Sequence, residues 1–230
     1  MGVVAFLGDG SLGDGGLEMQ LFSRTAVLAG DPTAGMAWAI KIGDYVTQKT
    51  GRPVTTWAAQ FGSPIGTTVW SSFVEGLADF QAAFGGLLGD PGYLALGAEG
   101  AAFNTTPHMA MMRQVIVGGP SAGGTAPGVG AITTVTTAIC NAARLADAMA
   151  WGAELATYIA GVTGQTSAFL SDIHGPFGQV TWINGAPDAA TADAAADKIN
   201  ADPGFLQRVG GLSDLFVPGS GNRSTLVRIG

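Results

Sequence analysis

Charge and cysteine are both scarce in this chain of 230 residues, and each shortage excludes a class of protein. Only 12% of the residues are charged, and the ten lysines and arginines stand singly in a chain whose net charge is −7. Without a basic stripe to meet phosphates, we expect no nucleic-acid partner. Cys140 is the only cysteine, which excludes an intrachain disulfide and suits a reducing, cytoplasmic location.

Long hydrophobic runs are missing as well. No segment approaches the ~20 apolar residues that a membrane-spanning helix needs, so we expect no membrane span. The apolar run Val3–Leu7 is too short for the core of a secretory signal, and no basic residues precede it. These absences predict a soluble cytoplasmic protein.

Familiar catalytic and metal-binding motifs are absent too. The sequence has no P-loop and no zinc-type spacing. Its two histidines, His108 and His174, could hold a metal with Asp172, but a single Asp-x-His favours solvated loop residues, and we expect no metal and no cofactor. Residues 8–13 match the dinucleotide pattern G-x-G-x-x-G, yet the following Asp-Gly-Gly opposes the helix that this motif requires. We therefore interpret residues 1–16 as a glycine-rich N-terminal arm.

What the chain does contain is an internal echo. Met36-Ala37-Trp38 recurs as Met149-Ala150-Trp151, and further matches occur in the same order at a spacing of 113 and then 112: Tyr45 and Tyr158, Gly51 and Gly164, Trp70 and Trp182, and Asp90–Leu94 and Asp202–Leu206. A repeat of this length is too long for a solenoid unit. The echo predicts two duplicated units, residues 17–117 and 131–230, joined by a Gly/Pro-rich linker over residues 118–130.

Hydrophobic patterning predicts the same order of elements in each unit. In the first we expect a strand over Leu17–Ala29, a helix over Ala34–Lys49, a hairpin of Val54–Phe61 with Thr67–Val74, a helix over Glu75–Leu88, an irregular stretch over Gly89–Pro107 and a strand over Met109–Val117. The second repeats it with Val129–Cys140, Ala142–Gly161, Ser167–Ile173, Phe177–Ile183, Ala189–Asn200 and Ser224–Ile229. This βαββαβ order is that of a ferredoxin-like unit. Because helices cover one face only, the bare faces of the two sheets should meet, which predicts an α+β protein with two ferredoxin-like repeats forming an intrachain barrel.

The hairpin and the segment after the second helix carry a family likeness. The run Phe61–Gly66, Trp70 on the next strand and Asp90-Pro91-Gly92-Tyr93-Leu94 together resemble the NIPSNAP-type dimeric α/β-barrel domain, and the second copy repeats the pattern in Gly178, Trp182 and Asp202–Phe205. The resemblance implies membership of a superfamily that holds cofactor-free monooxygenases, polyketide cyclases, lactone isomerases and haem enzymes. Haem is not favoured, because His174 falls at a hairpin tip and His108 just before a strand, whereas the haem members place the proximal histidine on a helix of the C-terminal half.

The barrel interior is the place where a ligand site is expected. An arginine on a strand that faces a closed interior must find an anion or an acceptor, and tryptophans would supply apolar walls. The candidate ligand-binding residues are Arg24, Trp57, Gln60, Trp70, Arg113 and Trp182. Alternatively, both arginines lie at rims and contact only water. Neither histidine has an evident partner, so no pair of nucleophile and base is proposed.

Two functions remain open at this stage. The first is a non-catalytic protein that self-associates into a homo-oligomer, since a surface poor in charge has few charges to desolvate when chains meet. The alternative is a cofactor-free enzyme of the monooxygenase, cyclase or isomerase type, or a binder of a small, partly apolar ligand in the barrel. The faces that Arg24 and Arg113 occupy should separate the two. If there is a site, differences between the copies should mark it.

Overall fold

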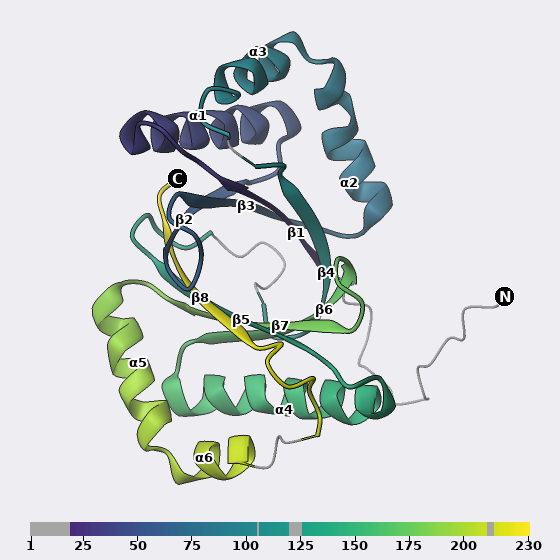
Figure 1. Cartoon of the computed structure of the whole chain (residues 1–230), viewed down its shortest axis with the longest axis vertical. Helices are drawn as coiled ribbons and strands as arrows, with labels where there is room; N and C mark the ends of the chain where they lie inside the picture. Colours follow the sequence, from purple (N-terminus) through teal and green to yellow (C-terminus); the bar gives the residue numbers. More distant parts are fainter. Residues whose placement is uncertain (1–18, 105, 120–125, 211–213) are drawn as a thin grey trace, which may run out of the picture.

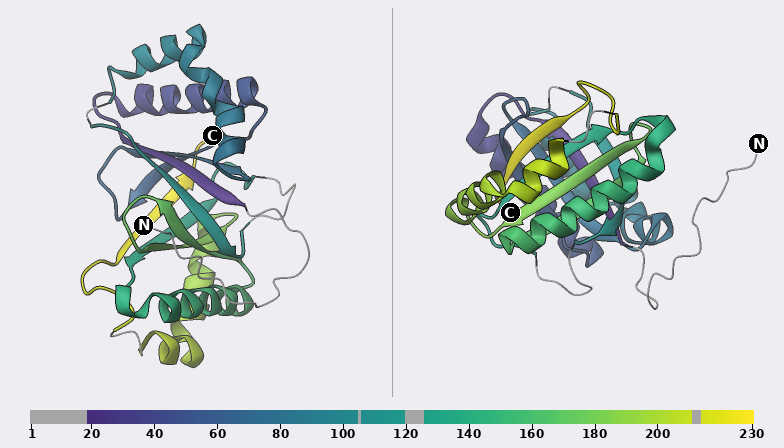
Figure 2. Two further views of the ribbon diagram at one scale, coloured as in Figure 1. Left: turned by 90° about the vertical axis from the view of Figure 1, so that its right-hand side faces the viewer. Right: turned by 90° about the horizontal axis from the view of Figure 1, so that it is seen from below.

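The centre of the molecule is a closed antiparallel barrel whose strands are arranged in the order β1-β3-β2-β8-β5-β7-β6-β4. The structure is a computed structural model that describes residues 19–104, 106–119, 126–210 and 214–230. Helices lie only outside the barrel, in two layers on opposite sides of it (Figures 1 and 2). The predicted N-terminal arm and its G-x-G-x-x-G motif fall outside the described residues, as does residue range 120–125 of the predicted linker.

The two halves of the chain have the same order of elements. The first half consists of β1 (Gln20–Val27), α1 (Pro32–Thr50), β2 (Thr55–Phe61), β3 (Thr67–Val74), α2 (Leu77–Phe84), the 3-10 helix η1 (Gly85–Gly89), α3 (Pro91–Gly100) and β4 (Met109–Val117). The second consists of β5 (Ile132–Ile139), the 3-10 helix η2 (Ala142–Arg144), α4 (Leu145–Thr163), β6 (Thr166–His174), β7 (Gln179–Ala186), α5 (Ala189–Ala201), α6 (Pro203–Gly210) and β8 (Asn222–Arg228).

Each half forms a ferredoxin-like sheet, and the two sheets close on each other. The strand order is β4-β1-β3-β2 in the first half and β8-β5-β7-β6 in the second. Two antiparallel seams join the halves, β2 with β8 and β4 with β6. The predicted fold class, an intrachain α+β barrel of two ferredoxin-like units, is therefore confirmed. The domain limits and the origin by duplication stay predictions.

Helix α1 shows why the sequence predicted its position well. The Asp31 side chain accepts hydrogen bonds from the backbone N–H groups of Thr33 and Ala34, and Pro32 occupies the first turn. Gly51 ends the helix with a φ of 68°, a left-handed conformation that glycine adopts without a steric penalty. Local chemistry therefore fixes both ends.

The stretch Gly89–Pro107 is not irregular as predicted, because it contains helix α3. The Asp-Pro pair stops the preceding helix and starts a new one. The Asp90 side chain caps α3 by accepting from the backbone N–H of Tyr93, with Pro91 in the first turn. Asp202 accepts in the same way from Phe205 ahead of α6, a helix that was not predicted from the sequence either. Among the described residues, no helix combines the length and the apolar character that crossing a bilayer requires.

Candidate functional site

The six candidate residues do not share one face of the barrel. Trp57 and Arg113 point inward, where their polar atoms meet Ser71 and Asp172 on other strands. Arg24, Trp70 and Trp182 point outward, toward the helices. Gln60 is exposed at the end of β2, next to a register shift that breaks the alternation of the strand.

The outward position of Trp70 and Trp182 corrects the sequence prediction and has a physical reason. Trp70 donates its indole N–H to the carbonyl of Ala39 on α1 at 2.8 Å, and Trp182 donates to the carbonyl of Gly152 on α4 at 3.1 Å. Each ring thus fills the space between sheet and helix and also satisfies its one donor. Arg24 lies directly opposite Trp70 in the β1–β3 register, so it shares the outer face.

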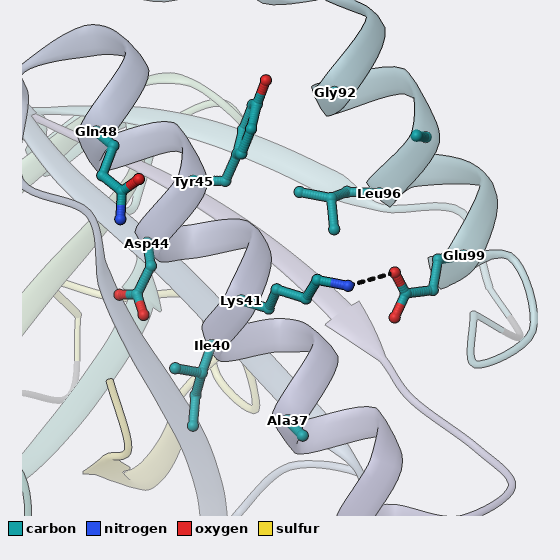
Figure 3. Close-up of a pocket in the computed structure, with 10 residues that line it drawn as sticks. Ala37, Ile40, Lys41, Asp44, Tyr45, Gln48, Gly92, Leu96 and Glu99 are labelled. Atoms are coloured by element: carbon teal, nitrogen blue, oxygen red, sulfur yellow. Dashed lines mark hydrogen bonds and ion pairs between the residues drawn. The ribbon is translucent and has the colours of Figure 1, made fainter.

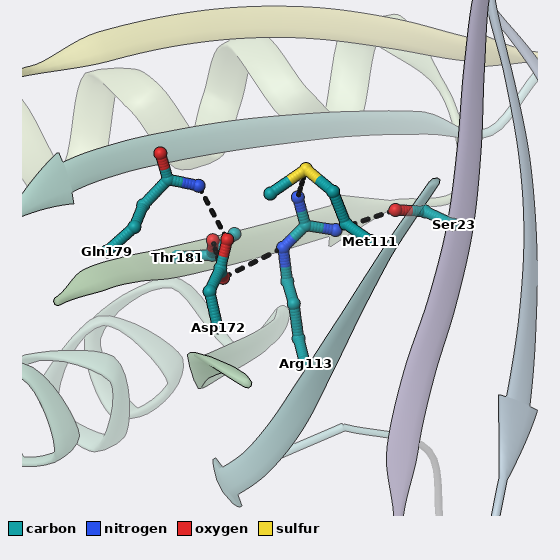
Figure 4. A network of polar contacts seen from close by, with 6 residues as sticks. All are labelled: Ser23, Met111, Arg113, Asp172, Gln179 and Thr181. Carbon is teal, nitrogen blue, oxygen red and sulfur yellow. Dashed lines mark hydrogen bonds and ion pairs between the residues drawn. The ribbon is translucent and has the colours of Figure 1, made fainter. Parts of the chain in front are cut away.

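Inside the barrel, Arg113 binds an anion that the protein itself provides. Its Nε donates to Asp172 Oδ1 at 3.0 Å, and its Nη1 donates to Ser23 Oγ at 2.8 Å. Gln179 and Thr181 also donate to the Asp172 carboxylate, at 2.6 and 3.1 Å (Figure 4). The two charged side chains are 10% and 0% exposed. Arg113 therefore needs no external anion.

The remaining interior close to this network is filled by protein. Leu21, Ala168 and Leu170 are buried together, with Phe73, Val115 and Ile183 packed around them. The indole N–H of Trp57 donates to Ser71 Oγ at 2.9 Å. Apolar side chains thus pack close to the polar network around Arg113 and Asp172.

Outside the first-half sheet, four polar or aromatic side chains gather under α3. Arg24 Nη1 contacts the Tyr93 hydroxyl at 3.0 Å, and the Arg24 guanidinium lies 5.9 Å from the centre of the Phe22 ring. The His108 ring lies 6.1 Å from the Trp70 ring, centroid to centroid. Arg24 and Tyr93 are partly buried and His108 is exposed, so the cluster is open to solvent.

The electrostatics of this cluster favour a neutral imidazole. Partial loss of water around the ring lowers the pKa of His108 below its ordinary value, and the positive charge of Arg24 lowers it further. At neutral pH the cluster therefore offers a proton acceptor beside a permanent cation.

The same place in the second half has different polar groups, because Arg223 on β8 donates its Nε to Thr136 Oγ1 at 3.2 Å. Trp182 occupies the position of Trp70, but Thr136 lies opposite it in the β5–β7 register where the first half has Arg24. Phe205 comes after the second capping aspartate where the first half has Tyr93. The rings around Trp182 are Trp151, Phe169 and Phe216. The two halves thus differ at the cluster of Arg24, Trp70, Tyr93 and His108, where Phe205 replaces the phenol and Thr136 takes the position of Arg24.

A groove also runs over the surface between α1 and α3. It has a volume of about 680 Å³, and the Lys41–Glu99 ion pair of 2.8 Å crosses it (Figure 3). Tyr45 and Gly92 face each other along it. A second groove of about 530 Å³ lies beside β5 and the segment before β8, lined by Ala138, Phe216 and Val217 among others.

Sequence reasoning found two members of the cluster and missed two. Arg24 and Trp70 were candidates because they lie on strands, whereas Tyr93 and His108 lie in or beside the stretch predicted to be irregular. The exchange of Tyr93 for Phe205 within an otherwise matching motif was the available signal. In the described part of the chain, no three histidine, cysteine or acidic side chains converge as metal ligands would. His174 is exposed at the end of β6.

Comparison with known proteins matches the whole barrel at low sequence identity. No protein-family model matches the chain, and no curated protein matches its sequence. The chain resembles a solved structure described as "putative monooxygenase" from Fusobacterium nucleatum subsp. nucleatum ATCC 25586, with 9% identity over 93% of each chain and a TM-score of 0.70. It also resembles an anthrone oxidase-like protein, with 13% identity over 94% of this chain and 92% of the other and a TM-score of 0.63.

A NIPSNAP-like domain protein from Burkholderia xenovorans matches a smaller part, 42% of this chain and 84% of the other, with 13% identity and a TM-score of 0.37. Both full-length matches extend across the two halves of this chain and of the solved structures. The chain therefore has the dimeric α/β-barrel fold, with both halves of the barrel in one polypeptide.

Proposed function

We propose that the chain binds a small aromatic compound with an acidic O–H or C–H group at the cluster of Arg24, Trp70, Tyr93 and His108, and removes a proton from it. The observation that carries this proposal is the divergence of the halves. The corresponding positions of the second half hold Trp182, Phe205 and Thr136, whereas the first half combines a cation, a phenol and a neutral imidazole. Arg24 and Tyr93 are partly buried and His108 is exposed, so solvent reaches the cluster.

The residues suit this chemistry in distinct roles. His108 is the proton acceptor, because a lowered pKa keeps its imidazole neutral at pH 7. Arg24 stabilises the anion that forms, since its charge is permanent and lies beside the ring. Trp70 is buried and forms the apolar wall beside His108, and its hydrogen bond to Ala39 holds it in place.

Oxygen is the second reactant in this proposal. The matched structures are described as a "putative monooxygenase" and as anthrone oxidase-like, which supports oxidation over isomerisation. A deprotonated, delocalised substrate carbon can react with O₂ without a cofactor. A CH₂ group then becomes C=O, one oxygen atom enters the substrate, and the other leaves as water with both hydrogens.

The test uses anthrone in air-saturated buffer, with oxygen uptake and the absorbance of the quinone product as readouts. His108→Asn should lower the protein-dependent rate by about 10²–10⁴-fold, because asparagine cannot accept the proton. The rate of the unaltered chain should fall as pH falls through the lowered pKa of His108, below the ordinary value of 6.5.

His174→Asn is the matched control, because His174 is an exposed histidine in the other half. It should leave the rate unchanged. A wild-type chain that adds nothing to the spontaneous oxidation of anthrone would contradict the proposal. So would a His108→Asn variant as fast as the wild type.

Self-association remains a second candidate, and one surface favours it. Strands β2 and β6 run in the same direction around the antiparallel barrel, so the β2–β3 and β6–β7 turns lie at the same end. Ile65 is 98% exposed in the first turn, and Phe177 is 90% exposed at the matching position of the second. Phe61 and Ile173 form a second exposed pair at the same spacing. Large apolar side chains exposed at one end of a molecule are typical of association surfaces.

The double variant Ile65→Ser with Phe177→Ser replaces the exposed side chain of each turn. It should shift the chain toward the monomer if these turns mediate association. Light scattering coupled to size-exclusion chromatography measures the mass directly. Leu88→Ser is the control, because Leu88 is exposed on η1, which belongs to neither turn. An unchanged mass in the double variant would remove the turns as the association surface.

A further inference from the structure

Tyr93, which contacts Arg24, lies in the first turn of α3. Asp90 caps that turn and accepts from the backbone N–H of Tyr93 at 2.8 Å. The same carboxylate receives two groups from α1, the Tyr45 hydroxyl and the Lys49 ammonium, the latter at 3.0 Å. The position of Tyr93 is thus tied to α1 through one aspartate.

The contact between Tyr45 and this turn is close. A Cβ atom at Gly92 would lie 2.1 Å from the Tyr45 hydroxyl oxygen, so only glycine leaves room for it. The Tyr45 hydroxyl, together with the Tyr93 N–H and Lys49, lowers the pKa of Asp90 far below its ordinary value, and the same hydrogen bond raises the pKa of Tyr45. The carboxylate is therefore charged at neutral and mildly acidic pH.

Contacts farther along α3 hold the rest of the helix to α1. The Trp38 indole N–H donates to the carbonyl of Leu96 at 2.8 Å, and Lys41 pairs with Glu99. These contacts anchor α3 to α1 along its length. In the described structure α3 makes one side-chain hydrogen bond to β1, between Tyr93 and Arg24, and the position of α1 therefore sets the geometry of that bond.

We propose that Tyr45 and Lys49 are positioning residues for the site, acting through Asp90 and Tyr93 on the Arg24 guanidinium. This inference rests on the proposed function for its kinetic consequence. Neither residue touches the ligand. Together they set the place of the cation that the ligand anion would meet.

The second half provides an internal control for this relay. Tyr158 donates to Asp202 at 2.6 Å, Asp202 accepts from the N–H of Phe205 at 2.7 Å, and a Cβ atom at Gly204 would lie 2.2 Å from the Tyr158 hydroxyl oxygen. The hydrogen bonds among tyrosine, aspartate and backbone are the same, although Arg208 stacks on the Tyr158 ring and no lysine matches Lys49. Phe205 has no hydroxyl through which this arrangement could act on a further side chain. Tyr158→Phe thus removes an equivalent hydrogen bond without reaching the site.

The experiment compares Tyr45→Phe with Tyr158→Phe in the full chain. Both should lower Tm by a similar amount. Only Tyr45→Phe should raise the pKa of His108, measured by NMR titration, because Arg24 is no longer held beside the ring. With anthrone, Tyr45→Phe should lower kcat/KM by about tenfold, the equivalent of one hydrogen bond, and Lys49→Met should act in the same direction.

Tyr93→Phe completes the test as a double-mutant cycle. If the relay acts through the Tyr93 hydroxyl, Tyr45→Phe should add little in the Tyr93→Phe background. Equal effects of Tyr45→Phe and Tyr158→Phe on the His108 pKa would overturn the inference, as would no effect of either. A wild-type chain that does not oxidise anthrone would contradict the proposed function only. The NMR titration of His108 would still test whether Tyr45 positions Arg24.

Discussion

Replacing Asp172 with leucine should lower the free energy of unfolding by about 3–5 kcal/mol, because it leaves a buried guanidinium without its anion. Arg113 is 10% exposed, and Asp172 accepts its Nε at 3.0 Å. Gln179 and Thr181 would lose their acceptor as well. Urea unfolding monitored by tryptophan fluorescence measures the loss, since Trp57 lies in the same interior.

The double variant Asp172→Leu with Arg113→Met separates the charge from the packing. With both charges gone, the apolar side chains fill a similar volume, and stability should return to within about 1–2 kcal/mol of the wild type. Glu99→Gln is the surface control, because the exposed Lys41–Glu99 pair should contribute at most about 1 kcal/mol. A loss for Asp172→Leu no larger than that of Glu99→Gln would mean that the interior pair is solvated in solution.

This pair also gives the two seams of the barrel different characters. Arg113 and Asp172 are direct partners where β4 meets β6, and the β4–β6 register shifts both before Arg113 and after Val115. The β2–β8 seam pairs Phe61 with Thr225 and Ala59 with Leu226 instead, and the described residues show no ion pair there. An ion pair therefore stabilises the β4–β6 seam, whereas backbone pairing and apolar contact stabilise the β2–β8 seam.

The fold was predictable where local chemistry decides. Asp31, Pro32 and Gly51 mark both ends of α1, and glycine at the hairpin turns lets the chain reverse. Prediction failed at α3 and α6, because Asp-Pro both ends one helix and begins the next. Short-range signals identify the break but not the helix after it, and only packing against α1 and α4 makes those short helices stable.

The candidate site was predictable only in part, because its residues are far apart in the sequence. Arg24 and Tyr93 are 69 residues apart, and they meet across a sheet and a helix. Strand alternation says which residues share a face but not which face the helices cover, so Trp70 and Trp182 were assigned to the interior. The more reliable signal was the difference between matching positions, Tyr93 against Phe205.

The largest non-additive effect should appear between Gly152 and Phe169. A Cβ atom at Gly152 on α4 would lie 2.4 Å from the Phe169 ring, which is 0% exposed and cannot move aside. Gly152→Ala should therefore lower the free energy of unfolding by about 1–3 kcal/mol through overpacking. Phe169→Ala should cost about 3–5 kcal/mol, because it removes a large buried ring and leaves a cavity.

The sign of the first effect should reverse in the background of the second. Once the ring is gone, the added methyl of Gly152→Ala meets a cavity, and alanine favours the helix by about 1 kcal/mol over glycine. Gly161→Ala on the same helix supplies the reference, because no atom lies within 4 Å of its Cβ position. It should stabilise both backgrounds equally, as chemical denaturation would measure. If Gly152→Ala remains destabilising without the ring, the close approach of α4 to the sheet is set by the Trp182 hydrogen bond to the Gly152 carbonyl and not by Phe169.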